Sequence, residues 1–190
     1  MYDAVSDAYC YPGTTVLKNR AGLRNQTDLD FFEEEATAQR FAEPLPPGIF
    51  DLRHLCRIHQ HLFQDVYPWA GALRTVRISK GGTAFCYPEN LQRELGRLFA
   101  DLAKQQDLSG LDADIFAERS AHFLAELNAI HPFREGNGRT QLSFLAALAD
   151  YAGHLFTLER IEPKAMLDAI ITSFGGSEAP LGTLIRRLIV

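Results

Sequence analysis

Residues 130–140 read IHPFREGNGRT and separate two segments of helical character. Apolar residues recur at three- and four-residue spacing on both sides of the stretch, as they do on the buried face of a helix. Pro132 disfavours helical geometry at the residue before it, so His131 is expected where the first helix ends. The sequence therefore predicts a loop that leads directly into a second helix, at about residues 131–152.

The same periodicity continues over most of the chain and predicts a mainly α protein, a helical bundle in a single domain of residues 1–190. One helix, carrying Phe31 and Phe41, is expected to start at a weak capping box of Thr27 and Asp30. The other helices are expected from Ile49 to Pro68, from Pro88 through Leu102, from about residue 112 to the loop, and at about residues 163–171 and 181–188.

Only residues 73–88, LRTVRISKGGTAFCYP, alternate as a strand does. Val76 and Ile78 alternate with polar neighbours, and Gly81 and Gly82 together form a strong turn signal. A short hairpin is therefore predicted at about residues 74–87. It either covers the helical core or offers an edge to a partner strand.

Bulk properties exclude several classes of protein. The net charge of -5 argues against direct binding of nucleic acid, which requires an excess of Lys and Arg. No run of roughly 18 apolar residues exists, so no segment is expected to cross a membrane, and the N-terminus lacks the features of a signal peptide. Three cysteines, Cys10, Cys56 and Cys86, without metal-type spacing suit a reducing compartment, and a cytoplasmic location is expected.

His131 is the candidate base of the loop. A histidine has an ordinary pKa of ~6.5 and is largely neutral near pH 7, so its imidazole can accept a proton from an attacking hydroxyl. The alternative is a buried histidine that only caps the end of a helix. The neighbouring residues favour the chemical role.

The residues that follow are suited to a phosphate chain. Gly136, Asn137 and Gly138 can present backbone N–H groups at the start of a helix, and Arg139 adds a forked cation. The carboxylate of Glu135 would repel phosphates unless a divalent cation such as Mg²⁺ lay between them. The set predicts a phosphoryl- or nucleotidyl-transfer site, and the alternative is an ordinary capped turn.

These residues resemble the signature of the Fic family, HPFx[D/E]GNGR, at all nine positions of HPFREGNGR. Residues 62–85, LFQDVYPWAGALRTVRISKGGTAF, resemble the approach to the family's hairpin flap. Residues 9–23, YCYPGTTVLKNRAGL, resemble the N-terminal stretch of small bacterial Fic toxins. The resemblance implies a Fic fold with the flap beside the active-site loop, and an enzyme that moves AMP from ATP onto a hydroxyl of a target protein.

The resemblance also implies a role for each matching residue. In chain order these roles are general base for His131, core anchor for Phe133, Mg²⁺ ligand for Glu135, anion hole for Gly136, Asn137 and Gly138, and a grip on the leaving phosphates for Arg139. The implied docking flap, which would pair with an extended segment of the target and add contacts from Lys80 or Phe85, comprises Ile78, Ser79, Lys80, Gly81, Gly82, Thr83 and Phe85. The kinase branch of the family carries a lysine where this chain has Gly138. The absence of that lysine disfavours a kinase activity.

Two departures from the family pattern affect the expected function. Leu142 stands where a second arginine is usual, which leaves three possibilities: an active transferase, one with altered nucleotide preference, or a catalytically weakened interaction module. The inhibitory pattern [S/T]xxxE[G/N] is absent, so restraint by a separate small antitoxin is expected. By the same resemblance, the expected targets are the B-type subunits of type II topoisomerases, gyrase and topoisomerase IV.

Three histidines on one predicted helix, His54, His59 and His61, do not share a face and are not expected to bind a metal. His59 falls among apolar residues and is interpreted as a hydrogen-bonded core histidine. Trp69 is interpreted as a packing anchor.

Overall fold

Helices dominate the computed structural model, which describes residues 3–4 and 7–190, with only the backbone described at 3–4. The α-helices are α1 (Gln26–Phe41), α2 (Leu52–Phe63), α3 (Leu91–Lys104), α4 (Ala113–Ile130), α5 (Asn137–Ala152), α6 (Pro163–Phe174) and α7 (Ala179–Leu188). Short 3₁₀ turns occur at Pro88–Asn90, Gln106–Leu108 and Leu158–Arg160, and the strands are β1 (Asp3–Ala4), β2 (Ile78–Lys80) and β3 (Thr83–Ala84).

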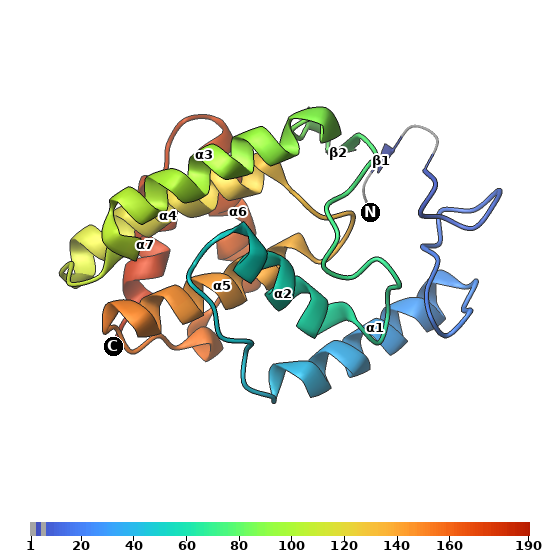
Figure 1. The fold of residues 1–190 in the computed structure, drawn as a ribbon, viewed down its shortest axis with the longest axis horizontal. Coiled ribbons are helices and arrows are strands. Elements are labelled where there is room, and N and C mark those ends of the chain that lie inside the picture. The colour runs from blue at the N-terminus through green and yellow to red at the C-terminus, as the bar shows by residue number, and fades with distance from the viewer. Residues whose placement is uncertain (1–2, 5–6) are drawn as a thin grey trace.

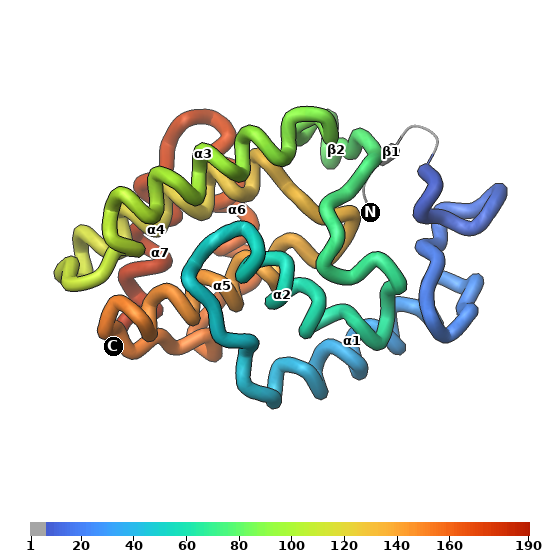
Figure 2. The backbone as a smooth tube through the Cα atoms, in the orientation of Figure 1, coloured from blue at the N-terminus to red at the C-terminus, as the bar shows by residue number. Residues whose placement is uncertain are grey.

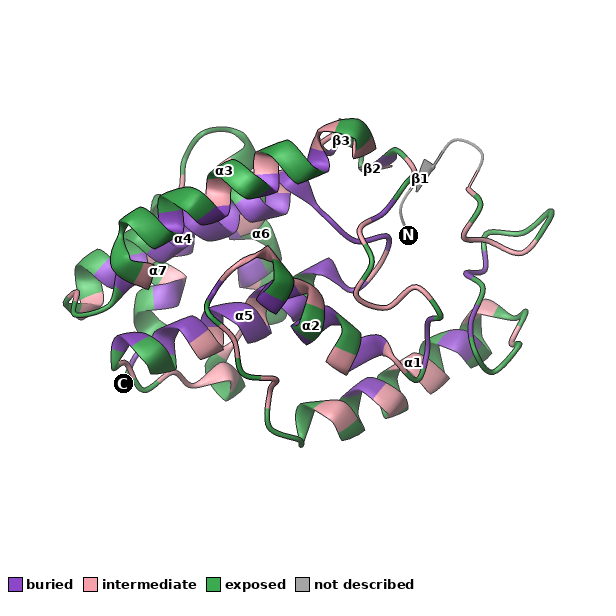
Figure 3. Cartoon of the chain, viewed as in Figure 1, coloured by how far each residue is buried: buried purple, intermediate pink, exposed green. Residues whose placement is uncertain are grey.

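The helices pack around α4 and α5, which meet at the loop of residues 131–136. Helices α3, α5 and α7 contact α4, while α2 contacts both α5 and α1 (Figure 1). Buried positions are frequent along α4 and α5 (Figure 3). Phe116 of α4 and Phe144 and Leu148 of α5 are fully buried. The mainly α fold class with a short hairpin is confirmed.

The two helices around the loop begin and end where their capping residues predict. The side chain of Asp112 accepts hydrogen bonds from two N–H groups in the first turn of α4, and Gly153 ends α5 with φ +90°. Both features are among the strongest sequence signals for helix ends, and they mark the start of α4 and the end of α5.

Helices α1 and α2 differ from the prediction at their ends. Asn25 caps α1 in place of the expected pair of Thr27 and Asp30, because its side chain accepts from the N–H groups of residues 27 and 28. Phe31 and Phe41 are exposed. Helix α2 starts after Asp51, its N-cap, and ends at Phe63, because the chain turns before it reaches the proline at position 68.

The hairpin forms as predicted, and a third strand joins it. Ser79 pairs with Ala84 and Lys80 with Thr83, across a turn at Gly81 and Gly82 with φ of +57° and +80°. Two positive φ angles define the tight turn that matches strand twist. On its other side β2 pairs with β1, a strand of two residues that the sequence did not predict.

The N-terminal stretch is tied to the central loop by an ion pair. Asp7 accepts from Nε and Nη2 of Arg134, at 2.8 Å and 2.5 Å, and the Arg134 side chain is almost fully buried. Over residues 3–4 and 7–190, no helix is both long and apolar enough to cross a membrane.

Candidate functional site

His131 lies at the C-terminal end of α4 in the left-handed conformation, with φ +52° and only 5% of its surface exposed. A non-glycine residue in this region carries strain of about 1–3 kcal/mol, so the surroundings must hold it there. Its Nδ1 lies 3.0 Å from the carbonyl oxygen of Asn128. Because a carbonyl only accepts, Nδ1 carries the proton of the neutral ring and Nε2 is the acceptor nitrogen.

Burial is the largest cause of an unusual pKa at His131. The pKa falls to about 3, because burial disfavours the charged ring and because the positive charges of Arg74 and Lys80 oppose protonation. The hydrogen bond to the carbonyl of Asn128 acts in the other direction and raises the pKa. The ring is therefore neutral near pH 7. His131 therefore does cap the end of α4, which was the alternative considered from the sequence. The same hydrogen bond fixes the tautomer that a general base requires.

Asn137 locks the loop into shape through its own side chain. Its Oδ1 accepts from the N–H of Phe133 at 2.9 Å, and its Nδ2 donates to the carbonyl of the same residue at 2.8 Å. The Asn137 side chain is buried, so only its backbone N–H remains as a contribution to a ligand. The first N–H groups of α5 have no partner within the helix and are suited to an anion.

His59 supports the loop from α2. The N–H of Gly71 donates to its Nδ1 at 2.7 Å, so its Nε2 carries the proton and donates to the carbonyl oxygen of Glu135 at 3.1 Å. Burial lowers the pKa of His59 to about 4, and its ring stacks on Phe133 at 3.9 Å. The interpretation as a hydrogen-bonded core histidine is confirmed. Its contact with the loop was not foreseen.

Gly136 fits its position because it lacks a side chain. It adopts φ +78°, and a Cβ added there would lie 2.3 Å from the buried ring of Phe63. Gly138 is different, since a Cβ there would meet no atom within 4 Å. Gly136 is therefore required by the fold. Gly138 leaves open space at the start of α5, where a ligand can approach the backbone.

Arg139 is held by helix α1, which the sequence did not suggest. Its Nη2 donates to Glu33 and its Nη1 to the hydroxyl of Thr37 at 3.3 Å, and the guanidinium lies over the ring of Phe63. The hydroxyl of Tyr67 donates to the second carboxylate oxygen of Glu33. The run Glu33–Glu35 looks like a solvated face in sequence, so no local signal marks Glu33 as the partner of Arg139.

Glu135 is half-buried beside this network. Burial raises the pKa of its carboxyl group, and the nearby charge of Glu33 raises it further, although the N–H of Gly136 donates to its Oε1 at 2.9 Å. The negative charge of Glu33 disfavours the charged form of Glu135, and a cation between Glu135 and a phosphate chain would relieve that cost.

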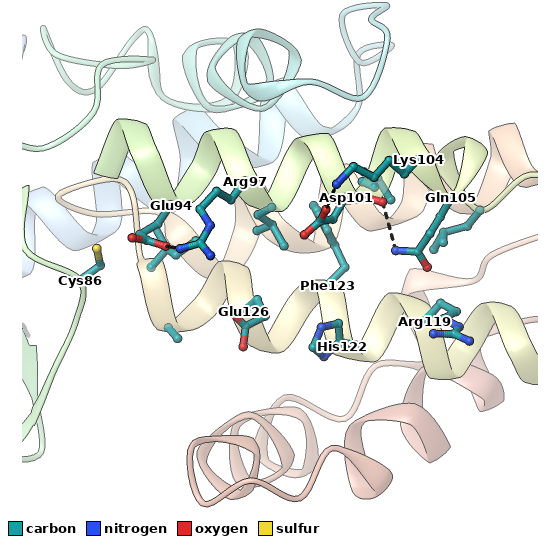
Figure 4. A pocket seen from close by; sticks show the side chains of 15 residues that line it. Cys86, Glu94, Arg97, Asp101, Lys104, Gln105, Arg119, His122, Phe123 and Glu126 are labelled. Atoms are coloured by element: carbon teal, nitrogen blue, oxygen red, sulfur yellow. Dashed lines mark hydrogen bonds and ion pairs between the residues drawn. The ribbon is translucent and has the colours of Figure 1, made fainter. Parts of the chain in front are cut away.

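Two hollows open onto these residues. One of about 470 Å³ is lined by Glu33, Thr37 and Arg139, and another of about 280 Å³ by Glu33, Tyr67 and Glu135. A separate hollow of about 700 Å³ lies between α3 and α4 and is lined by mixed charges such as Glu94, Arg97 and Asp101 (Figure 4). None of the loop residues 131–139 lines this third hollow.

The flap lies against His131 through Phe85. The two rings stack with centroids 3.9 Å apart, and Phe85 is 7% exposed. The Phe85 ring packs on the histidine, so without a target bound most of it is covered, and of the two expected contact residues Lys80 is the exposed one. Ile78 is also buried, whereas Lys80, Gly81, Gly82 and Thr83 are exposed and Ser79 is half-buried.

Leu142 and Trp69, the two other positions singled out in the sequence, contribute to packing. Leu142 is half-buried and packs against the core, which accounts for an apolar residue there. Trp69 stacks on Tyr67 and meets the edge of Tyr9, as expected of a packing anchor.

The central loop of this helical bundle joins a buried neutral histidine to a helix start whose N–H groups are suited to the phosphates of a nucleotide. The chain matches the model of the Fic/DOC family over residues 49–149, and it belongs to that family. The chain is an enzyme of the nucleotidyltransferase class, because its relatives within the family are named protein adenylyltransferases.

Relatives over nearly the whole chain agree with this assignment. A probable protein adenylyltransferase, y4lH of Sinorhizobium fredii, is 52% identical over 99% of this chain and 98% of its own length. The probable protein adenylyltransferase Fic of Escherichia coli is 41% identical over 96% and 92%. The crystal structure of BepC from Bartonella tribocorum with bound AMPPNP superposes with a TM-score of 0.86, at 28% identity and 96% coverage of both chains.

Proposed function

We propose that this protein is a protein adenylyltransferase, which moves AMP from ATP onto a hydroxyl of a target protein. The observation that carries the proposal is the geometry of His131: a buried neutral imidazole, with its proton fixed on Nδ1, at the head of a loop that ends in a helix N-terminus. Support also comes from the names of the relatives and from the nucleotide analogue in the BepC structure.

The phosphate chain would bind at the start of α5. The N–H groups of Asn137 and Gly138 would meet phosphate oxygens, and the N–H of Gly136 would join them once it releases Oε1 of Glu135. Arg139 would neutralise the phosphates that leave. To bind the phosphates, Arg139 must first break its ion pair with Glu33. Leu142 leaves Arg139 without the help of a second arginine, so this exchange determines how tightly ATP binds.

Glu135 is suited to a divalent cation in the presence of the nucleotide. Its carboxylate is half-buried, its pKa is raised by burial, and Mg²⁺ usually binds proteins through one or two carboxylates together with substrate phosphates. When bound, Mg²⁺ would supply positive charge to the polyphosphate. Glu135 would then hold the cation, while its carbonyl stays fixed by His59.

His131 would act as the general base. The hydroxyl oxygen of the target forms a bond to the α-phosphorus, and its proton passes to Nε2. The bond from the α-phosphorus to the bridging oxygen breaks, and diphosphate leaves with that electron pair. A pKa near 3 makes the nucleotide-free ring a weak base. The arriving phosphates bring negative charge, which raises that pKa towards the value a base needs.

The flap would align the target by main-chain pairing, a docking mode that tolerates many sequences. Because β1 occupies the outer edge of β2, the incoming strand must pair along β3 or displace β1. On the resemblance to small bacterial toxins, we propose the B-type subunits of gyrase and topoisomerase IV as targets and a small antitoxin as the inhibitor.

The test uses ATP labelled at either the α- or the γ-phosphate, with Mg²⁺ and a bacterial lysate. Label from the α-phosphate should enter a protein, and His131→Ala should abolish it. His122→Ala is the matched control, because His122 is an exposed histidine paired with Glu178 away from the loop. Transfer of the γ-label would indicate a kinase, and no transfer of either label would contradict the proposal.

A further inference from the structure

Arg74 is a fully buried arginine at the base of the flap, with 2% of its surface exposed. Within the part of the chain that the structure describes, its guanidinium donates to four backbone carbonyls: Nε to His131 at 2.7 Å, Nη1 to Val76 at 2.8 Å, and Nη2 to Cys86 and to Ile130 at 3.1 Å. Burial lowers the pKa of Arg74 to about 10, so the group is still charged near pH 7. Among the described residues, no carboxylate forms an ion pair with it.

The carbonyls that Arg74 and its surroundings satisfy are those at the end of α4. A helix leaves its last four carbonyls without partners inside the helix. Here the N–H and Nδ1 of His131 donate to residues 127 and 128, the N–H of Cys86 donates to Ala129, and Arg74 donates to Ile130. The backbone N–H of Arg74 then donates to Pro132 at 2.9 Å. The flap base therefore caps the helix that ends at His131.

The flap segment and the loop run side by side in the structure, although they are far apart in sequence (Figure 2). Arg74 donates to the carbonyls of the residues on both sides of the peptide bond that enters His131. This fixes the strained backbone of the histidine, and with it the orientation of the ring between the carbonyl of Asn128 and the ring of Phe85. A cation at the negative end of a helix is also favourable.

We propose that Arg74 is a positioning residue for the transfer reaction, which sets the backbone and the tautomer of His131 and joins the flap to the loop. This inference rests on the proposed role of His131 as the base. Two positive groups from the flap, Arg74 and Lys80, act on the His131 ring, and α4 contributes the neutral carbonyl of Asn128. Removal of Arg74 therefore removes one of the two flap charges that oppose protonation of the ring.

The test compares Arg74→Met and Arg74→Lys with the parent, and uses Arg93→Met, an exposed arginine on α3, as the control. Nitrogen-15 NMR of labelled histidine reads the tautomer and pKa of His131, whose signals are identified by their loss in His131→Asn. Arg74→Met should mix the two tautomers and raise the pKa of the ring, because one of the charges that oppose its protonation is lost. In the transfer assay kcat should fall roughly 100-fold with the KM for ATP unchanged.

Arg74→Lys retains the charge but cannot reproduce the fork, so it should keep the pKa low and still lose kcat. If a urea titration shows that Arg74→Met does not fold, the kcat and the His131 pKa of Arg74→Lys test the proposal instead. An unchanged tautomer and pKa in folded Arg74→Met, or parental kcat in Arg74→Lys, would overturn the proposal. The NMR measurement needs neither ATP nor a target, so it gives its answer even if no transfer is found.

Discussion

Gly136→Ala should destabilise the fold, and Gly138→Ala should not, although the two glycines are two residues apart in one motif. Gly136 has φ +78°, and its added methyl group would lie 2.3 Å and 2.4 Å from two carbons of the Phe63 ring. That ring is fully buried and supports the guanidinium of Arg139 from below, so it cannot move without disturbing the site.

The loss of unfolding free energy in Gly136→Ala follows from the positive φ angle and from the clash with Phe63. Alanine in the left-handed region costs about 1–2 kcal/mol, and overpacking of a core costs about 1–3 kcal/mol. Gly136→Ala should therefore lose about 2–5 kcal/mol of unfolding free energy. Gly138 lies in the first turn of α5 with open space around its Cα, so alanine there should be neutral or gain up to ~1 kcal/mol.

Urea unfolding of the nucleotide-free protein measures both changes, and calorimetry with ATP then separates structure from binding. Gly138→Ala should keep its stability yet bind ATP more weakly, because its methyl group occupies the space through which phosphate reaches the backbone. If Gly136→Ala were within about 0.5 kcal/mol of the parent, the packing of the loop on Phe63 would be wrong. Unchanged ATP affinity in Gly138→Ala would argue against a phosphate at the start of α5.

Three further changes test other parts of the site. Leu142→Arg should tighten ATP binding about tenfold in calorimetry, since a charge-assisted hydrogen bond contributes roughly 1.5–3 kcal/mol; no gain would leave Leu142 with a packing role alone. Glu33→Gln should release Arg139 and also tighten ATP binding, whereas weaker binding would mean that Glu33 orients the arginine. The lowered pKa values of His131 and His59, about 3 and about 4, mean that the unfolded chain binds more protons below pH 6.5. Stability should therefore fall as the pH drops from 6.5 towards 4, by about 2 kcal/mol per histidine at pH 5. In urea titrations at pH 5, His131→Asn should lose about 2 kcal/mol less than the parent. An equal loss in parent and variant would contradict the burial of a neutral His131.

Local signals predicted the parts of the molecule that depend on neighbouring residues. The ends of α4 and α5 follow from Asp112 and Gly153, and the hairpin turn follows from its glycine pair. The helix end at Phe63 was missed because a proline five residues later was the more visible signal, although the chain had already turned.

Long-range contacts explain what the sequence did not predict. Arg74 looks like an exposed residue near an alternating strand, and it is buried only because the end of α4 brings unsatisfied carbonyls to it. Glu33 is one of three successive glutamates, and α1 turns this one towards Arg139. Strand β1 consists of two residues, too few to show a period, and only β2 gives it a partner.

A crystal structure with a non-hydrolysable ATP analogue and Mg²⁺ tests the central claim most directly. The phosphates should lie on the N–H groups at Gly136, Asn137 and Gly138, with the α-phosphorus facing Nε2 of His131 and Glu135 on the metal. A nucleotide bound elsewhere, or one whose α-phosphorus faces away from the His131 ring, would contradict it.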